Sequence, residues 1–195
     1  MLDRTFLFDG YRDYFKKLVP RDSEIVLAHN DAQENNILTS LEDNTKITLI
    51  DYEYGGWNPM AMDIANYLNE CCLENAHPKG VGIKVYLENF PSQYECNSLM
   101  KSYLKCYYER KASTAGEDYN AFEKKTLPRF RREVEACCLL NNYYWGVWAL
   151  AVLRDKDVCD DKVFNYEFAI SRIKMYKMQT KLFQEQKTSE SSPEI

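Results

Sequence analysis

Histidine and paired cysteine motifs are scarce in this 195-residue chain. It contains two histidines, His29 and His77, and seven cysteines, among which no C-x-x-C spacing occurs. Structural zinc sites need several Cys or His ligands at short spacings, so no such site is expected. The odd cysteine count, together with an N-terminus that lacks an apolar secretory segment, predicts reduced, buried thiols and a cytoplasmic location.

Basic residues are also fewer than acidic residues. The chain has 25 Lys and Arg residues against 30 Asp and Glu residues, which gives a formal net charge of −5. A protein that binds nucleic acid without sequence preference needs a basic face for the phosphates, so no nucleic-acid partner is expected. The acidic excess is compatible with a cationic substrate, although an excess of this size is ordinary.

One uncharged run, from Ala136 to Leu153, approaches the length of a membrane span. Asn141, Asn142 and Gly146 interrupt it, and its Tyr and Trp residues lie in the middle rather than at the ends. Aromatic residues of membrane spans gather at the two interfaces instead. The run therefore predicts a buried helix in a soluble unit, and no membrane span is expected.

Apolar periodicity predicts a mostly helical chain with a few strands. Strands are expected at 24–28, 36–38 and 46–51, and a polar turn joins the last two into a hairpin. Helices are expected at 5–18, 60–75, 94–110, 120–153 with a break at Pro128, and 161–183. Residues 1–183 are expected to form one domain, followed by a polar, disordered tail at 184–195.

The stretch LAHNDAQENNIL, residues 27–38, concentrates polar residues between apolar flanks. His29, Asp31 and Asn36 give the spacing H-x-D-x4-N, which is typical of a phosphotransferase catalytic loop. A carboxylate in this position can accept or orient the proton of an attacking hydroxyl, and an amide oxygen nearby can coordinate a metal ion. Asp31 is therefore the predicted catalytic base, and Asn36 is a predicted Mg²⁺ ligand.

Asp51 is the second predicted Mg²⁺ ligand. It ends the second strand of the hairpin, so its side chain is expected to return to the same end as Asn36. Mg²⁺ prefers hard oxygen donors and usually takes only one or two carboxylates from a protein. Capping residues and loop amides alone often produce the first triplet, but the added hairpin and Asp51 favour a catalytic site over simple loop caps.

A pair of tryptophans suggests how a cation is held. Trp145 and Trp148 are three residues apart, so both rings are expected on one face of a helix. Tryptophan is the best cation–π partner, and aromatic cages commonly hold quaternary ammonium groups. Two core tryptophans are the alternative for such a pair in isolation, whereas the phosphotransferase loop favours a cage.

The segments HNDAQENNIL, LIDYEYGGWNP, DIANYLNE and WGVW, in this order, resemble the choline/ethanolamine kinases. The resemblance covers roughly residues 27–183 and implies an α+β, protein-kinase-like fold. In that fold a mostly helical C-terminal lobe carries the catalytic loop on a small β-hairpin, and the N-terminal lobe is expected to be absent here. The bare H-x-D-x4-N spacing also fits aminoglycoside phosphotransferases, and the other segments favour the choline/ethanolamine kinases.

By this resemblance, Asp31 matches the catalytic base, Asn36 a metal ligand and Asp51 the main Mg²⁺-binding carboxylate. Gln33, in the nucleotide-phosphate and metal loop, lies where the choline-kinase branch usually has Gln, which favours choline over ethanolamine. Glu70 matches the acidic residue near the substrate ammonium.

The resemblance also bears on the amine pocket. Phe168 aligns with a Tyr of the family's cage, and it would bind substrate with Trp145 and Trp148 through a ring face that lacks the hydroxyl. Asn75 departs from the family, because another cage Tyr is expected there. Asp63 is expected to cap the helix that starts near residue 60 and to brace the catalytic loop.

The expected activity is the ATP- and Mg²⁺-dependent phosphorylation of choline to phosphocholine, the first step of phosphatidylcholine synthesis by the CDP-choline route. Ethanolamine is the alternative substrate. Residues 1–26 contain no Gly-rich loop and no strand-borne Lys to hold ATP phosphates, so half of the nucleotide clamp is expected to be missing. A homodimer through the missing N-terminal region is expected of the complete enzyme, and a non-catalytic partner or small-molecule binding module is the alternative function.

Overall fold

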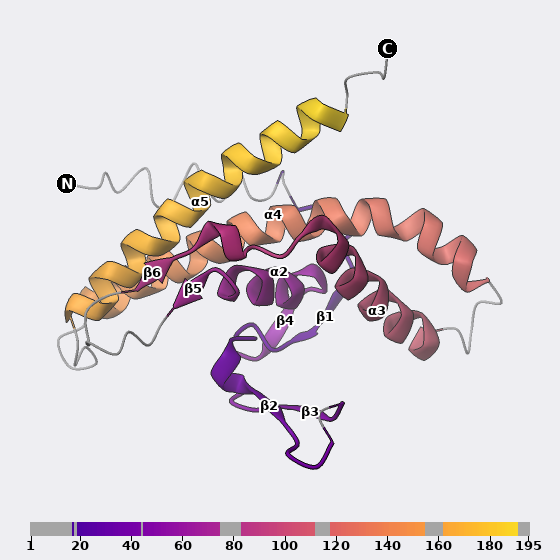
Figure 1. The fold of residues 1–195 in the computed structure, drawn as a ribbon, viewed down its shortest axis with the longest axis horizontal. Coiled ribbons are helices and arrows are strands. Elements are labelled where there is room, and N and C mark those ends of the chain that lie inside the picture. Colours follow the sequence, from indigo (N-terminus) through magenta and orange to yellow (C-terminus); the bar gives the residue numbers. More distant parts are fainter. Residues whose placement is uncertain are drawn as a thin grey trace.

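The computed structural model describes residue 17 and residues 19–43, 45–74, 83–111, 118–154 and 162–190, with side chains up to residue 184. In this part of the chain, α-helices form the body and short antiparallel strand pairs lie beside it (Figure 1). The long helices are α2 (Ala61–Glu70), α3 (Gln93–Lys111), α4 (Tyr119–Arg154) and α5 (Lys162–Glu190). The mostly helical character is confirmed, and the helix predicted at 5–18 lies outside the described residues, apart from Lys17.

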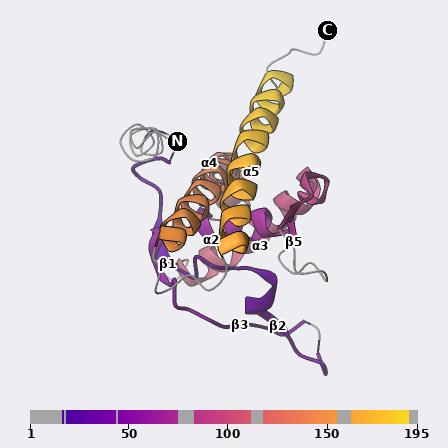
Figure 2. The same cartoon turned by 90° about the vertical axis from the view of Figure 1, so that its left-hand side faces the viewer.

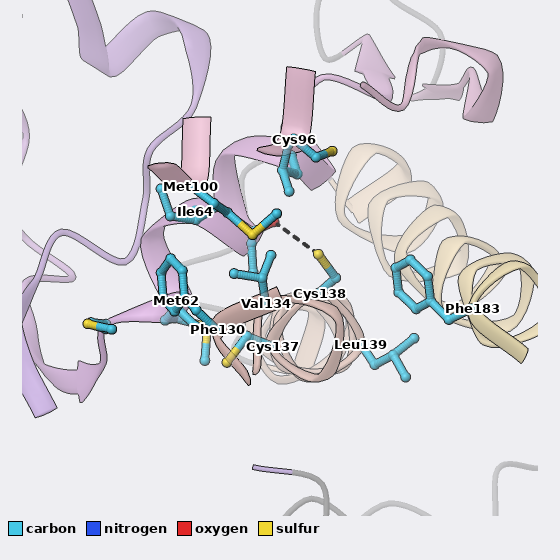
Figure 3. Close-up of a cluster of buried hydrophobic side chains, with 14 of the residues drawn as sticks. Met62, Ile64, Cys96, Met100, Phe130, Val134, Cys137, Cys138, Leu139 and Phe183 are labelled. Carbon is cyan, nitrogen blue, oxygen red and sulfur yellow. Dashed lines mark hydrogen bonds between the residues drawn. The ribbon is translucent and has the colours of Figure 1, made fainter. Parts of the chain in front are cut away.

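Helix α4 is the central element, because it packs against α2, α3 and α5. Its inward side chains divide between two hydrophobic clusters. The first lies between α2, α3 and α4 (Figure 3), and its most deeply buried members include Met100, Leu104, Phe130, Cys137 and Cys138. The second joins α4 and α5 to the β5–β6 region through Cys72, Leu73, Trp145, Phe168, Ala169 and Met175. Trp145 and Phe168 therefore belong to a packed hydrophobic cluster between helices.

Three strand pairs are present in the described residues. Strand β2 (Ile37–Thr39) pairs with β3 (Ile47–Leu49), and this predicted hairpin projects away from the helices (Figures 1 and 2). Strand β1 (Ile25–Ala28) pairs with β4 (Gly56–Pro59), and β5 (Leu73–Glu74) pairs with β6 (Lys84–Val85). Because β1 and β4 are neighbours, the chain between them leaves the helical body and returns to it at the same place. This excursion contains the predicted catalytic loop and the β2–β3 hairpin.

Three element boundaries differ from the sequence predictions. Helix α2 ends at Glu70 rather than near residue 75, because Leu73 and the next residue pair with β6 instead. Helix α4 runs unbroken through Pro128, since the packing of its neighbour Phe130 in the core outweighs the one hydrogen bond that a proline cannot donate. Helix α5 continues to Glu190, past the predicted end at residue 183. Two short 3-10 turns, Glu34–Asn36 and Leu87–Asn89, complete the described elements.

The uncharged run predicted to form a buried helix lies in the second half of α4. Among the described residues, α4 is the one helix long and apolar enough to cross a membrane by length and composition, and 50% of its apolar window is buried inside the protein. Asn141 and Asn142, in the middle of the run, are buried and hydrogen-bonded to other helices. The prediction of a buried core helix is confirmed.

The cysteines give a first testable prediction. The six described cysteines are free thiols, and Cys106 is exposed. Burial raises the pKa of Cys72 and of Cys137 to about 12 and also raises the pKa of Cys138 well above its ordinary value. The thiolate is the reactive form, so iodoacetamide at about pH 8 should alkylate Cys106 and leave these three unmodified until the protein unfolds. Peptide mass spectrometry with and without denaturant checks this, and equal labelling of Cys106 and Cys137 in the native protein would contradict it.

The cytoplasmic location that was expected from the sequence stays a prediction.

Candidate active site

The loop after β1 is held by two side chains of α2. Asp63 accepts hydrogen bonds from the backbone N–H groups of His29, at 2.9 Å, and of Asn30, at 2.7 Å. One turn later, Asn66 accepts from the backbone N–H of Ala32. These N–H groups have no strand partner, so side chains must satisfy them. The predicted bracing role of Asp63 is confirmed, but its predicted role as a helix cap is wrong, because α2 begins without a side-chain cap.

His29 aligns the loop with the end of the hairpin. Its Nε2 lies 2.8 Å from the backbone oxygen of Ile50, and its Nδ1 accepts from the backbone N–H of Asp31 at 3.3 Å. The proton is therefore on Nε2, which donates to Ile50. The ring is buried and packs on Tyr52 at 4.5 Å between centroids. His29 thus serves the loop's geometry rather than its chemistry.

Asp31 and Asn36 are directly connected. Asn36 Nδ2 donates to both the backbone oxygen and the carboxylate Oδ2 of Asp31, each at 2.9 Å. The backbone oxygen of Asn36 accepts from the N–H of Ile50 at 3.0 Å, which ties the pair to the hairpin. No described group bonds Asn36 Oδ1. The amide therefore holds Asp31 with its nitrogen and keeps its oxygen for a ligand.

The surroundings of Asp31 suit a proton acceptor. Burial raises the pKa of the Asp31 carboxyl, and the negative charge of Glu70 raises it further. The hydrogen bond from Asn36 and the positive charge of Arg172 act in the opposite direction but do not cancel the rise. A carboxylate whose pKa lies above its ordinary value accepts a proton from a hydroxyl more readily.

Asp51 lies one residue beyond Ile50, at the base of the hairpin. Its backbone has a positive φ of 64°, and Asn30, at the other end of the loop, has a φ of 65°. Asp and Asn tolerate this left-handed conformation better than other non-glycine residues, and such positions concentrate at functional sites. The side chain of Asp51 is exposed, so its oxygens are open to a ligand.

The donor set fits a magnesium ion that is shared with phosphate groups. Among the described residues, no group of three or more His, Cys, Asp or Glu side chains is arranged so that it could hold a metal ion. The protein would therefore contribute the carboxylate of Asp51 and the amide oxygen of Asn36, which are hard donors of the kind that Mg²⁺ takes. Phosphate oxygens and water would complete the shell, as is usual for Mg²⁺. Both ligand assignments stay predictions.

Tyr54, which was not predicted as a site residue, links the loop to the tryptophans. Its backbone oxygen accepts from Asn30 Nδ2 at 2.9 Å, and its ring centroid lies 5.0 Å from that of Trp145. Burial raises the pKa of the Tyr54 phenol, and the negative charges of Glu53, Asp31 and other groups add to this. Gly55 closes the turn that presents this ring, and a Cβ there would lie 2.9 Å from the backbone oxygen of Tyr52. The signal in the sequence that could have identified Tyr54 as a site residue is a Tyr three residues after Asp51, followed by a Gly that leaves no room for a side chain.

The two predicted tryptophans do share one face of α4. Their ring centroids are 5.3 Å apart, and Trp148 lies 6.3 Å from Tyr54. Phe168, from α5, lies 6.4 Å from Trp145 and 6.5 Å from Trp148. Trp145 is only 5% exposed, whereas Trp148 and Tyr54 are half-buried. The structure therefore brings together the three predicted rings and Tyr54.

Glu70 lies at the end of α2 in a buried ion pair. Its Oε1 accepts from Nη2 of Arg172, with side-chain exposures of 6% for Glu70 and 2% for Arg172. The Arg172 guanidinium also lies over the ring of Phe168, with Cζ 4.7 Å from the centroid. Sequence reasoning missed Arg172, because it lies 102 residues from Glu70 and in no recognised motif.

Three further residues belong to the loop or to the predicted site. Gln33 Oε1 accepts from Asn35 Nδ2 at 3.0 Å within the loop, and its assignment as a selectivity residue stays a prediction. Glu34, which was not predicted, is close enough to Glu70 for that charge to raise the pKa of Glu34, after the larger effect of burial. Asn75 lies outside the described residues.

Comparison with known proteins agrees with this geometry. A family profile described as Choline/ethanolamine kinase matches residues 9–177. Probable choline kinase 1 of Arabidopsis thaliana is 32% identical over 135 residues, covering 69% of this chain and 35% of that protein. Ethanolamine kinase 1 of Mus musculus is 34% identical over 128 residues, covering 66% of this chain and 31% of that protein. The chain spans about a third of the length of these curated relatives.

A solved structure of similar fold supports the same assignment. Choline kinase from Cryptosporidium parvum Iowa II superposes with a TM-score of 0.61 at 27% identity, covering 92% of this chain and 44% of that chain. The matching relatives include both choline and ethanolamine kinases, at similar identities. With the family profile matching most of its length, this chain belongs to the choline/ethanolamine kinase family.

Proposed function

We propose that the chain carries the catalytic base, the metal ligands and the amine pocket for ATP-dependent phosphorylation of choline, with ethanolamine as the alternative substrate. The observation that carries this proposal is the position of Tyr54, whose backbone bonds the Asp31 loop while its ring joins Trp145 and Trp148. A substrate whose ammonium group lies at the half-buried rings of Tyr54 and Trp148 would therefore have its hydroxyl end near the Asp31 carboxylate. The binding site for the amine and the catalytic base would then form one site.

In the proposed reaction, Asp31 accepts the proton of the substrate hydroxyl. The hydroxyl oxygen forms a bond to the γ-phosphorus of ATP, and the bond from that phosphorus to the bridging oxygen breaks, so that ADP leaves with the electron pair. Asn36 keeps the Asp31 carboxylate oriented through its Nδ2 hydrogen bond. When bound by Asn36 and Asp51, Mg²⁺ would offset the negative charge of the phosphates.

Choline is the favoured substrate in this proposal. Its trimethylammonium group cannot donate hydrogen bonds, so it depends on ring faces and on desolvated cation–π contact. Trp148 and Tyr54 are the half-buried rings of the group and offer such surfaces. This group of rings is therefore better suited to a quaternary than to a primary ammonium.

The proposed activity is tested directly by phosphate transfer. The chain is incubated with ATP labelled at the γ-phosphate, Mg²⁺ and either choline or ethanolamine, and the phosphorylated amine is measured by chromatography. Labelled phosphocholine that depends on both Mg²⁺ and choline supports the proposal. Because the chain spans about a third of its relatives, amine binding without transfer would favour the alternative, a small-molecule binding module or non-catalytic partner. A homodimer stays a prediction.

The pocket gives a prediction that needs no ATP. Trp148→Ala should weaken choline binding at least about tenfold, since a desolvated cation–π contact contributes about 2 kcal/mol. Ethanolamine should be weakened less, because a primary ammonium is held mainly by hydrogen bonds. Calorimetric titration of each amine into the chain measures both effects. Trp57→Ala is the matched control, because Trp57 is 75% exposed on β4. Equal choline affinity in folded Trp148→Ala and in the parent would make the tryptophans core residues only.

A further inference from the structure

Phe168 lies in a stack formed within α5. Residues 164, 168 and 172 are four apart, so they follow one another along one face of the helix. The Phe164 and Phe168 rings are nearly parallel, at 6.1 Å and 18°, and the Arg172 guanidinium lies 4.7 Å over the Phe168 ring. The Phe168 ring is therefore stacked with one residue of its own helix and in contact with the guanidinium of another.

The tryptophans consequently meet Phe168 at steep angles. The ring planes of Trp145 and Phe168 make 86°, and those of Trp148 and Phe168 make 78°. Aromatic pairs at such angles are edge-to-face contacts. Tyr54 and Trp148 also meet edge to face, at 83°, but both are half-buried, whereas Phe168 is only 9% exposed. The cation held by the face of Phe168 is Arg172.

Arg172 is connected to a series of hydrogen bonds between buried polar side chains. Its Nη1 donates to Asn142 Oδ1 at 3.3 Å, and Asn142 Nδ2 donates to Gln179 Oε1 at 2.9 Å. Gln179 Nε2 donates in turn to Asn69 Oδ1 at 2.8 Å, and Asn69 is the neighbour of Glu70 in α2. These hydrogen bonds tie α2, α4 and α5 together beside the Glu70–Arg172 ion pair, although Arg172 Nε is buried without a hydrogen-bond partner. Hydrogen bonds between buried side chains are electrostatically stronger than in water, so they help to hold the guanidinium in place.

We infer that Arg172 is a positioning and specificity-determining residue of the amine pocket: its guanidinium is the cation that Glu70 and Phe168 hold, which leaves the substrate ammonium to Trp148 and Tyr54. The inference rests on the proposed function and assigns new partners to Glu70 and Phe168. The ion pair has no net charge, so it neither attracts nor repels a cationic substrate strongly. A primary ammonium has three N–H donors that need acceptors, whereas a trimethylammonium group has none. With a carboxylate oxygen of Glu70 bonded to Arg172, the pocket discriminates in favour of choline.

A double-mutant cycle tests this inference. Choline and ethanolamine are titrated calorimetrically into the parent chain, Glu70→Gln, Arg172→Met and the variant with both substitutions. Glu70→Gln leaves the Arg172 charge without its partner beside the pocket, so it should weaken both amines by about tenfold. Arg172→Met frees a carboxylate oxygen of Glu70 for a charge-assisted hydrogen bond, so the affinity for ethanolamine relative to choline should rise about tenfold. The double variant, again neutral, should bind both amines within about threefold of the parent.

Two results would overturn the inference. If Glu70 contacted the substrate ammonium directly, the double variant would bind as weakly as Glu70→Gln. If Arg172 were merely structural, Arg172→Met would weaken both amines by the same factor and leave their ratio unchanged. Replacing a buried ion pair by neutral groups of similar volume is often neutral for stability, so the double variant decides the matter even if a single variant fails to fold.

Controls separate this inference from the proposed function. Arg132→Met removes one guanidinium from an exposed position of α4 and should leave both affinities unchanged. Circular dichroism establishes that each titrated variant is folded. A folded parent chain that binds neither amine would overturn the proposed function and this inference together. A parent that binds both amines, with a ratio that no folded variant changes, would overturn the inference alone.

Discussion

Replacing Asp31 with Asn is expected to slow phosphate transfer to choline by about 100- to 10,000-fold, the range that general-base groups contribute. The amide has the shape of the carboxylate but cannot take the hydroxyl proton. The fold should survive, because the hydrogen bonds of the Asp31 backbone to His29 and Asn36 remain. Initial rates are measured at saturating ATP and choline, with the gene product that contains this chain.

The control for this variant is Asp43→Asn. Asp43 is a carboxylate in the turn of the β2–β3 hairpin, where it accepts hydrogen bonds from Thr45. Its replacement should leave the rate within about twofold of the parent, as surface substitutions usually do. Choline affinity should stay close to that of the parent in both variants. A rate for Asp31→Asn within a few-fold of the parent would remove Asp31 from the mechanism.

Asp51→Ala is expected to lose activity to a similar degree and to need more Mg²⁺ for what remains. The substitution removes the carboxylate that is assigned to the magnesium ion, and carboxylates are the ligands that supply charge to it. Asn36→Ala should raise the Mg²⁺ requirement less, since a neutral amide contributes less charge. The rate is measured as a function of Mg²⁺ concentration at fixed ATP.

The two metal variants are distinguished by their side effects. Asn36→Ala also removes the hydrogen bond to the Asp31 carboxylate, so its rate should fall even at saturating Mg²⁺. Asp51→Ala leaves that bond intact, and higher Mg²⁺ should recover part of its rate. An unchanged Mg²⁺ dependence in Asp51→Ala would contradict the assignment of Asp51 as a ligand.

The parts of the site that could be predicted from the sequence are those set by local spacing. The β2–β3 hairpin follows from two short apolar runs around a polar turn, and its strands pair as expected. Trp145 and Trp148 meet because residues three apart share a helix face. The closeness of Asp31 and Asn36 follows from a short loop that a single amide can span.

The parts that could not be predicted depend on contacts between distant segments. Strand β4 was missed because its sequence, GWNP, is poor in β-branched residues and is held by pairing with β1. Asp63 looks like a helix cap in the sequence, but the unpaired N–H groups of the loop compete for its carboxylate and win. Arg172 has no local signal, since its partner Glu70 belongs to another helix.

The most direct test of the account compares choline with a neutral molecule of the same shape. In 3,3-dimethylbutan-1-ol, a carbon atom replaces the quaternary nitrogen, so the alcohol and the bulk are kept while the charge is lost. A pocket that holds a desolvated cation against aromatic rings should bind choline about thirtyfold more tightly than this alcohol in calorimetric titrations of the chain. Equal affinity for the two molecules, or no binding of either to the folded chain, would contradict the account.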